Sequence, residues 1–305
     1  MSRMIRGAAA LAAAVLALSA CGGGGDGDPL SGGGGEGGGQ TITIGGADFP
    51  ESGLIGEIYA QALESKGVKV ERKFSIGSRE VYYDQVKSGA IQVFPEYNGA
   101  LLAYLDKENP ASTTQEVDAA LKQKLPAELE VLAPSQAENK DTLAVTAATA
   151  SKYKLTTIED LKPVAGELVV GGPPEFKTRQ QGLVGLEKVY GVKFKEFKSL
   201  DTAGPITVSN LAKNQIQAAD LFSTDAAIKK NGFVALQDPK NVFGAQNVLP
   251  LVYKSKINDT VRTALNAVSA KLTTAGLQEM NSEMSEKKTD PETVAKDWLG
   301  KNGLG

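Results

Sequence analysis

The chain has 305 residues, with 33 Lys and Arg against 36 Asp and Glu, a single Cys and no His. This near balance of charge excludes a nucleic-acid-binding protein that depends on a basic surface. Without His and with one Cys, the chain cannot form a Ser-His-Asp or Cys-His catalytic site, an intrachain disulfide or a cysteine-based metal site.

The first 20 residues have the pattern of a secretory signal. Arg3 and Arg6 form a short positive region, and the apolar run at 8–20 is too short to span a bilayer. The segment 18–21 reads Leu-Ser-Ala-Cys and resembles the bacterial lipoprotein signal, in which the Cys is lipidated and becomes the mature N-terminus. We therefore expect lipidation of Cys21. An ordinary signal peptide with an incidental Cys is the alternative.

The segment that follows, 22–39, contains 12 Gly and almost no apolar side chains. Such a composition cannot bury apolar surface, so residues 21–39 are expected to form the lipidated Cys and a flexible tether. Its root-mean-square reach would be about 20–25 Å. These features predict an exported protein that a lipid holds at the outer face of the cell membrane or in the periplasm.

From residue 41 onward, runs with strand and helix periodicity alternate. The first series predicts strands at 41–45, 68–74, 91–94 and 141–147, and helices at 54–63, 79–88, 98–105 and 114–125. The second series predicts strands at 168–171, 193–197, 218–222 and 248–254, and helices at 178–190, 206–214, 223–231 and, in two or three pieces, 259–299.

This alternation predicts an α/β fold with mainly parallel sheets. The folded part of the chain is too long for one doubly wound domain of ordinary size, so we expect two lobes. Ligands of such folds bind beyond the carboxyl ends of the strands, which places the expected cleft between the lobes.

Unusual residues gather in the loops at these strand ends. The segments are Asp48-Phe49-Pro50-Glu51, Gly77-Ser78-Arg79, Pro95-Glu96-Tyr97-Asn98, Pro174-Glu175-Phe176 with Arg179, and Leu221-Phe222-Ser223-Thr224-Asp225. In their order and spacing they resemble the substrate-binding proteins of ABC importers for glycine betaine, choline and related osmoprotectants, over roughly 41–299. The resemblance implies a two-lobed, type II periplasmic-binding-protein-like fold, with lobe I at 40–144 and 244–305 and lobe II at 145–243.

The same resemblance implies which residues contact the ligand. A quaternary ammonium group has no N–H to donate, so aromatic faces bind it, and an arginine binds a carboxylate. The ligand-binding residues implied in this way are Tyr97, Arg179, Phe222, Ser78, Thr224, Phe49, Gln246 and Leu143. Leu143 and Gln246 stand where the family often has aromatic residues, which leaves open a non-quaternary polar solute, such as an amino acid or a thione-type betaine.

Several of these positions have a second interpretation. Arg179 is expected in the first turn of a helix that begins near Thr178, where it either binds a ligand carboxylate that also faces the helix N-terminus or is only a solvated residue. Ser78 and Thr224 either contact the ligand or only cap helices. Asp48, Glu51 and Glu96 can form a carboxylate cluster, to which no metal is assigned. The segment Gly171-Gly172-Pro173-Pro174 predicts a rigid turn rather than a phosphate-binding loop.

We therefore predict a solute-binding lipoprotein, not an enzyme, which closes its lobes on a small zwitterionic or quaternary-ammonium solute. It would be a monomer without a cofactor, would not bind nucleic acid, and would deliver its solute to the permease and ATPase subunits of an ABC importer. The alternatives are a surface hydrolase that uses carboxylates and a binding module that signals without a transporter.

Overall fold

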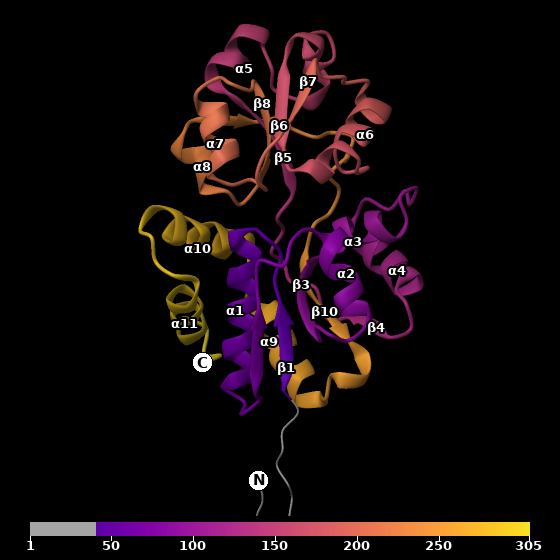
Figure 1. Ribbon diagram of the computed structural model, residues 1–305, viewed down its shortest axis with the longest axis vertical. Coiled ribbons are helices and arrows are strands. Elements are labelled where there is room, and N and C mark those ends of the chain that lie inside the picture. Colours follow the sequence, from indigo (N-terminus) through magenta and orange to yellow (C-terminus); the bar gives the residue numbers. More distant parts are fainter. Residues whose placement is uncertain (1–40) are drawn as a thin grey trace, which may run out of the picture. The chain divides into compact units, whose positions relative to one another are not determined.

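The computed structural model describes residues 41–305, which belong to one compact unit built on two five-stranded sheets (Figure 1). The predicted signal, Cys21 and the tether lie outside the described residues. The two-lobed α/β prediction is confirmed. None of the helices within 41–305 is both long enough and apolar enough to cross a membrane.

Lobe I is built on the sheet β2-β1-β3-β10-β4. Its strands are β1 (Ile42–Gly45), β2 (Val70–Lys73), β3 (Val93–Tyr97), β4 (Leu129–Val131) and β10 (Val248–Tyr253). Its helices are α1 (Pro50–Glu64), α2 (Arg79–Lys87), α3 (Asn98–Leu105), α4 (Thr114–Lys124), α9 (Asp259–Lys271), α10 (Thr274–Glu286) and α11 (Pro291–Lys301), with a 3₁₀ turn at Lys254–Lys256.

Lobe II is built on the sheet β7-β6-β8-β5-β9. Its strands are β5 (Asp141–Thr146), β6 (Val169–Gly172), β7 (Glu196–Ser199), β8 (Ala218–Phe222) and β9 (Phe233–Ala235). Its helices are α5 (Ala147–Tyr153), α6 (Leu183–Gly185), α7 (Pro205–Ala212) and α8 (Ala226–Lys230), with 3₁₀ turns at Ile158–Leu161, Ala165–Glu167 and Pro174–Lys177 and a π-helical turn at Leu186–Tyr190.

Each sheet is mixed rather than mainly parallel. In lobe I, β1 pairs in parallel with β2 and β3, whereas β10 is antiparallel to β3 and β4. Lobe II repeats this arrangement, with β5 antiparallel to β8 and β9. The two antiparallel strands, β5 and β10, are those that the chain forms just after it crosses from one lobe to the other. Neither strand is reached by a βαβ crossover from another strand of the same sheet, so neither has to run parallel to its neighbours.

The chain enters lobe II earlier than residue 145. The whole of β5 pairs within the second sheet, beginning with Asp141 opposite Phe222. A boundary at Val145 would divide one continuous ladder of hydrogen bonds, so the change of lobe comes before Asp141. On the return path, Phe243 packs in the core of lobe II and Val248 begins β10 in lobe I.

The helix predicted at 178–190 is confirmed only in its second part: residues 178–182 form turns, and the chain becomes helical at Leu183, with α6 followed directly by the π-helical turn Leu186–Tyr190. A Cβ at Gly182 would lie 2.1 Å from the carbonyl oxygen of Phe176, and a Cβ at Gly185 would lie 1.9 Å from that of Gln180. These close backbone contacts replace a regular helix, and only glycine permits them. β4, β9 and α5 are further elements that the sequence pattern did not predict.

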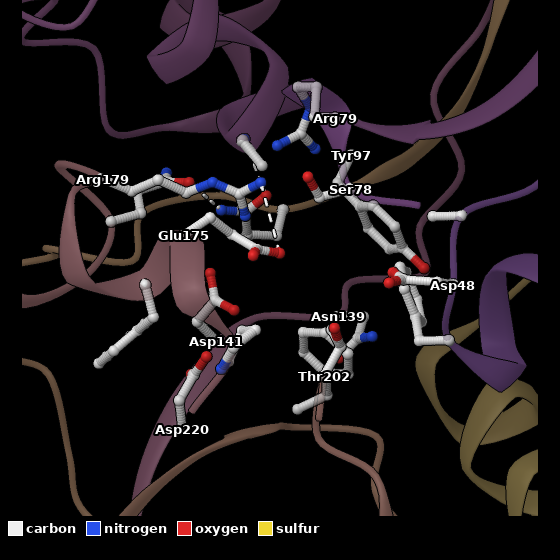
Figure 2. Close-up of a pocket in the computed structure, with 18 of the residues that line it drawn as sticks. Asp48, Ser78, Arg79, Tyr97, Asn139, Asp141, Glu175, Arg179, Thr202 and Asp220 are labelled. Carbon is white, nitrogen blue, oxygen red and sulfur yellow. Dashed lines mark hydrogen bonds and ion pairs between the residues drawn. The ribbon is translucent and has the colours of Figure 1, made fainter. Parts of the chain in front are cut away.

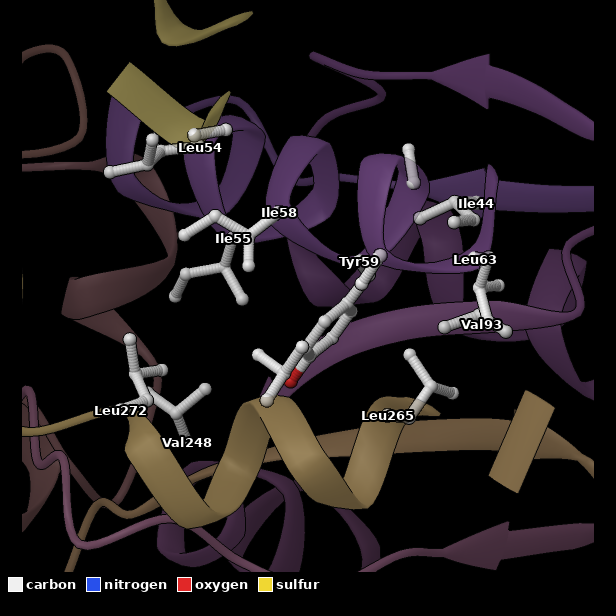
Figure 3. Close-up of a cluster of buried hydrophobic side chains, with 14 of the residues drawn as sticks. Ile44, Leu54, Ile55, Ile58, Tyr59, Leu63, Val93, Val248, Leu265 and Leu272 are labelled. Atoms are coloured by element: carbon white, nitrogen blue, oxygen red, sulfur yellow. The ribbon is translucent and has the colours of Figure 1, made fainter. Parts of the chain in front are cut away.

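The core of lobe I fixes the position of α1, whose first turn faces the region of the predicted site. Ile55, Ile58 and Tyr59 on α1 are at most 1% exposed and pack in one cluster with Leu265 of α9 (Figure 3). Burial of such an aliphatic side chain stabilises the fold by about 1.5–3 kcal/mol. Pro50 begins the helix, where a proline costs nothing because its missing N–H has no intrahelical partner.

Candidate functional site

A cavity lined by both lobes contains most of the predicted ligand-binding residues (Figure 2). It measures about 650 Å³, including the part that is open to solvent. Six of the eight predicted residues line it: Phe49, Ser78, Tyr97, Arg179, Phe222 and Gln246. Residues of both lobes meet here because most of them end a strand or lie in the loop after one, whereas Gln246 precedes β10, which is antiparallel to β3 and so begins at the same edge of the sheet.

Three rings from the two lobes form what we call the aromatic wall of the cavity: Phe49, Tyr97 and Phe222. Phe49 precedes α1, Tyr97 ends β3 and Phe222 ends β8. The centroid of the Phe49 ring lies 6.1 Å from that of Tyr97 and 5.0 Å from that of Phe222. Such a wall offers electron-rich faces to a cation that has no hydrogen to donate.

Leu143 and Thr224 do not line the cavity. Leu143 is fully buried in the core of lobe II, because it lies two residues farther along β5 than Asp141, the residue at the cavity. The hydroxyl of Thr224 donates to Glu51 Oε2 at 2.6 Å and is buried. A direct contact of either residue with a ligand therefore has no support from the geometry.

The carboxylate of Glu51, in the first turn of α1, accepts four hydrogen bonds. Its Oε1 accepts from the hydroxyl of Tyr97 at 2.7 Å and from Nδ2 of Asn139 at 2.8 Å. Its Oε2 accepts from Thr224 and, at 2.6 Å, from Nδ2 of Asn281. The donors belong to β3, the crossover before β5, the loop after β8 and α10, so this Glu51 hub joins both lobes and the C-terminal helices.

Arg79 lines the cavity, but its charge is already paired. Its Nε and Nη2 each donate to one carboxylate oxygen of Glu96 at 2.8 Å, and Tyr82 donates to the same carboxylate at 2.7 Å. Arg79 is 7% exposed and Glu96 is fully buried. Two parallel hydrogen bonds of this kind make a strong, rigid ion pair, so Arg79 brings little free positive charge to a ligand.

Arg179 is paired in the same way, across the two lobes. Its Nε and Nη2 donate to Glu80 of α2 at 3.1 and 2.8 Å, and Glu175 Oε1 lies 3.9 Å from Nη2. Burial favours the neutral form of Glu80, but the hydrogen bond and charge of Arg179 outweigh it and lower the pKa of Glu80 to about 2. Arg179 follows the 3₁₀ turn Pro174–Lys177 and not a helix start, so no helix N-terminus assists it.

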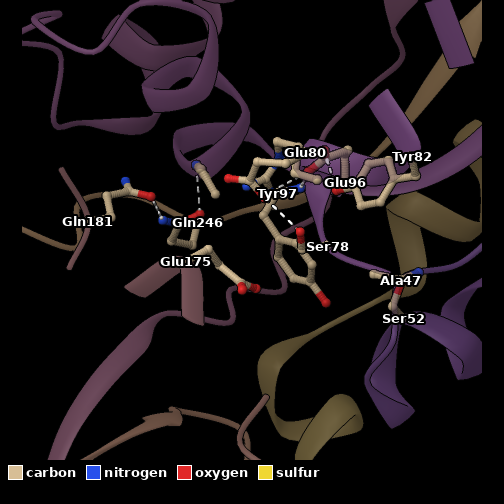
Figure 4. Close-up of polar contacts among 12 residues, drawn as sticks. Ala47, Ser52, Ser78, Glu80, Tyr82, Glu96, Tyr97, Glu175, Gln181 and Gln246 are labelled. Atoms are coloured by element: carbon tan, nitrogen blue, oxygen red, sulfur yellow. Dashed lines mark hydrogen bonds and ion pairs between the residues drawn. The ribbon is translucent and has the colours of Figure 1, made fainter. Parts of the chain in front are cut away.

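Ser78 and Gln246 also hold polar contacts within the protein. The hydroxyl of Ser78 does not cap α2 and donates instead to Glu80 at 2.8 Å. Gln246 is 1% exposed, accepts from the backbone N–H of Ala100 at 3.0 Å and donates to Gln181 at 2.9 Å (Figure 4). Gln246 therefore links the return crossover to both lobes at the rear of the cavity.

Three carboxylates of lobe II line the cavity, and the sequence analysis did not select them for the site: Asp141, Glu175 and Asp220. Asp141 and Asp220 lie diagonally across the β5–β8 pair on the same face of the sheet, with their carboxyl groups side by side (Figure 2). Burial raises the pKa of Asp141 to about 6, and burial together with the charge of Asp141 raises the pKa of Asp220 well above its usual range. An acidic residue within an otherwise apolar strand, as in Ala-Ala-Asp-Leu-Phe, was the available signal.

One glycine of β6, Gly172, makes room for Asp220. Gly171 and Gly172 belong to a strand, so the predicted rigid turn is wrong for them. A Cβ on Gly172 would lie 3.0 Å from the Cβ of Asp220, and one on Gly171 would lie 2.6 Å from the side chain of Ile216. The side chain of Asp220 therefore occupies space that any residue other than glycine at 172 would crowd.

Two α/β lobes, each with a five-stranded mixed sheet, and a cavity lined by both define a two-lobed solute-binding protein of type II. Comparison with known proteins agrees. Residues 40–301 match the family described as the substrate-binding domain of ABC-type glycine betaine transport systems, and the chain belongs to this family. It is thus the substrate-binding component of an ABC transporter, and its family is one of extracytoplasmic binding proteins.

Individual relatives cover most of the chain. The glycine betaine-binding protein YehZ of Escherichia coli K12 is 30% identical over 276 residues, which is 86% of this chain and 90% of YehZ. The carnitine transport binding protein OpuCC of Listeria monocytogenes is 27% identical, with 86% of this chain and 87% of OpuCC covered. The structure of apo YehZ matches with a TM-score of 0.59 and 28% identity, over 87% of this chain and 99% of that chain. A glycine betaine/carnitine/choline ABC transporter structure matches with a TM-score of 0.67 and 23% identity, over 86% and 99%.

Proposed function

We propose that the protein binds a small quaternary-ammonium solute of the glycine betaine, choline or carnitine type in the cavity between its lobes, and delivers it to the permease. The aromatic wall carries this proposal. Each ring that faces a trimethylammonium group contributes about 0.5–2 kcal/mol, more when water is excluded. Because lobe I supplies Phe49 and Tyr97 and lobe II supplies Phe222, a bound cation favours the arrangement in which the lobes are closed.

The relatives support the same class of solute. YehZ is named for glycine betaine and OpuCC for carnitine, and both solutes carry a trimethylammonium group beside a carboxylate. The cavity, however, offers such a carboxylate no arginine without a partner, since Glu96 and Glu80 already hold the two that line it. The shared ammonium group is therefore the part of the solute that the site is best suited to bind.

Isothermal titration calorimetry with glycine betaine, choline and carnitine tests the proposal. At least one of them should bind saturably and without chemical change. Phe222→Leu keeps the apolar volume and removes the ring face, so it should weaken that binding about 2- to 30-fold. Phe197→Leu, made at a half-buried ring of lobe II that does not line the cavity, is the matched control and should leave the affinity unchanged. If the two substitutions weakened binding equally, the aromatic wall would not be part of the binding site.

We further propose that lipidation of Cys21 holds the protein at the outer face of the membrane. The apolar run that ends at Cys21 supports this, and a diacylated Cys supplies the two chains that stable anchoring needs. Metabolic labelling with a fatty-acid analogue should mark the protein in the membrane fraction. Cys21→Ala should abolish both the label and the membrane association. Membrane association that survives this substitution would contradict the lipid anchor.

A further inference from the structure

The positive charges that line the cavity are neutralised by the protein itself. Only two of the cavity-lining residues within 41–305 are basic, Arg79 and Arg179. Each donates two hydrogen bonds to a single glutamate, Glu96 and Glu80 respectively. Neither guanidinium can receive a ligand carboxylate with the same geometry unless it first gives up its present partner.

The acidic side chains that line the cavity have no such close ion-pair partner. Asp48, Asp141, Glu175 and Asp220 line it, and Glu175 has only the long contact of 3.9 Å to Arg179. Asp220 is 4% exposed, and its Oδ1 is buried without a hydrogen-bond partner among residues 41–305. A carboxylate oxygen in this position lowers the stability of the protein, because it has lost its water and gained no donor.

The protein has nevertheless made room for this group. Gly172 has no side chain where a Cβ would lie 3.0 Å from the Cβ of Asp220. Asp141, across the β5–β8 pair, directs a second carboxyl group to the same place at the cavity wall (Figure 2). An unpartnered acidic pair held at the wall of a solute cavity is what a cationic ligand with a hydrogen-bond donor requires, since the ligand supplies both the charge and the donor.

We propose that the solute is a net cation without a carboxylate, whose N–H or O–H group donates to the Asp141–Asp220 pair while its ammonium group lies against the aromatic wall. This inference rests on the proposed function and narrows it. A zwitterion would bring its carboxylate against acidic side chains that have no basic partner at close range, and two carboxylates at close range repel strongly where water is excluded. Choline has the required chemistry, because its hydroxyl replaces the carboxylate of glycine betaine.

Four probes, titrated calorimetrically into the purified protein at pH 7.5, separate the contributions. Choline carries the cation and the donor, tetramethylammonium carries the cation alone, and glycine betaine carries the cation and a carboxylate. Ethanolamine carries the donor on an unmethylated cation. Choline is expected to bind at least 10-fold more tightly than glycine betaine and at least 5-fold more tightly than tetramethylammonium.

The outcomes distinguish this inference from the proposed function. Glycine betaine binding as tightly as choline, or more tightly, overturns the inference and leaves the proposed function intact. Ethanolamine binding while no trimethylammonium compound binds supports the acidic pair and overturns the quaternary-ammonium proposal. Failure of all four probes overturns both.

Substitution of the pair tests its role directly. Asp220→Asn and, separately, Asp141→Asn are expected to weaken choline binding at least 10-fold and to leave glycine betaine binding unchanged or stronger. Simple damage to the fold would weaken both ligands alike, so the change in their ratio is the informative readout. Asp297→Asn, at an exposed aspartate of α11, is the matched control and should change neither affinity. An unchanged ratio in both pair variants would overturn the inference.

Discussion

Two groups of acidic side chains, the Glu51 hub and the Asp141–Asp220 pair, each contain a buried carboxyl group but differ in how its oxygens are satisfied. Four neutral donors from four segments surround Glu51. Asp220, equally buried at 4% exposed, has an oxygen with no donor and an acidic neighbour. Burial alone therefore does not assign a role to a carboxylate. One whose hydrogen bonds are complete joins parts of the fold, whereas one left incomplete at a cavity wall is available to a ligand.

The largest expected effect comes from the hub. Glu51→Ala should lower the free energy of unfolding by about 4 kcal/mol, because it leaves four donors without their acceptor, most of them buried. Urea denaturation measures this. Glu64→Ala, on the same helix at a half-exposed ion pair with Arg72, is the matched control and should cost at most about 1 kcal/mol. Equal costs for the two substitutions would mean that the hub does not hold the lobes together.

The acidic pair should affect stability in the opposite direction, and in a pH-dependent way. Raised pKa values mean that the folded protein keeps protons on Asp141 and Asp220 that the unfolded chain releases. Their contribution to stability is therefore complete below the ordinary aspartate pKa of about 4 and is lost as the pH rises through the folded value, about 6 for Asp141. Glu175, Arg79 and Arg179 also act on the pair, the acid raising these pKa values and the arginines lowering that of Asp141.

Replacing both acids, Asp141→Asn with Asp220→Asn, should thus raise the free energy of unfolding of the ligand-free protein at pH 7 by roughly 2 kcal/mol. The difference from the original protein should shrink to near zero at pH 4. Urea titrations of both proteins at pH 4, 5, 6 and 7 measure it, and Asp297→Asn should show no such trend. If the double variant were instead less stable than the original protein at pH 7, the acidic pair would have a structural role like that of the Glu51 hub.

The smallest effect is expected for Arg179→Ala. This substitution tests whether Arg179 serves only as the partner of Glu80 or also binds a solute carboxylate. As the exposed partner of Glu80, Arg179 should contribute less than about 1 kcal/mol to stability, and Arg179→Ala should leave choline affinity within about 3-fold. As the ligand for a solute carboxylate, it should contribute about 2–5 kcal/mol to the binding of glycine betaine. Calorimetry of both ligands with this one variant decides between them. Lys188→Ala, at another ion pair between the lobes, the exposed pair with Glu108, is the control.

Local signals in the sequence were sufficient for much of the fold. The apolar spacing of α1, the apolar run of β8 and the glycines after several helices depend on neighbours a few residues away, and the structure has these elements near their predicted places. The prediction of a regular helix over 178–190 failed at 178–182, because the course of the chain there depends on backbone contacts at Gly182 and Gly185, which a periodic pattern does not reveal.

The sequence by itself determined that no histidine-dependent catalytic site, intrachain disulfide or cysteine-based metal site can form, that two α/β lobes form, and that Phe49, Tyr97 and Phe222 stand near strand ends. Only the tertiary structure decided which charges remain free at the cavity. Glu80 lies 99 residues from Arg179, and Asn281 lies 230 residues from Glu51. Such pairings follow from how lobes and helices pack, and electrostatic interactions depend on distance and burial in space rather than on separation along the chain.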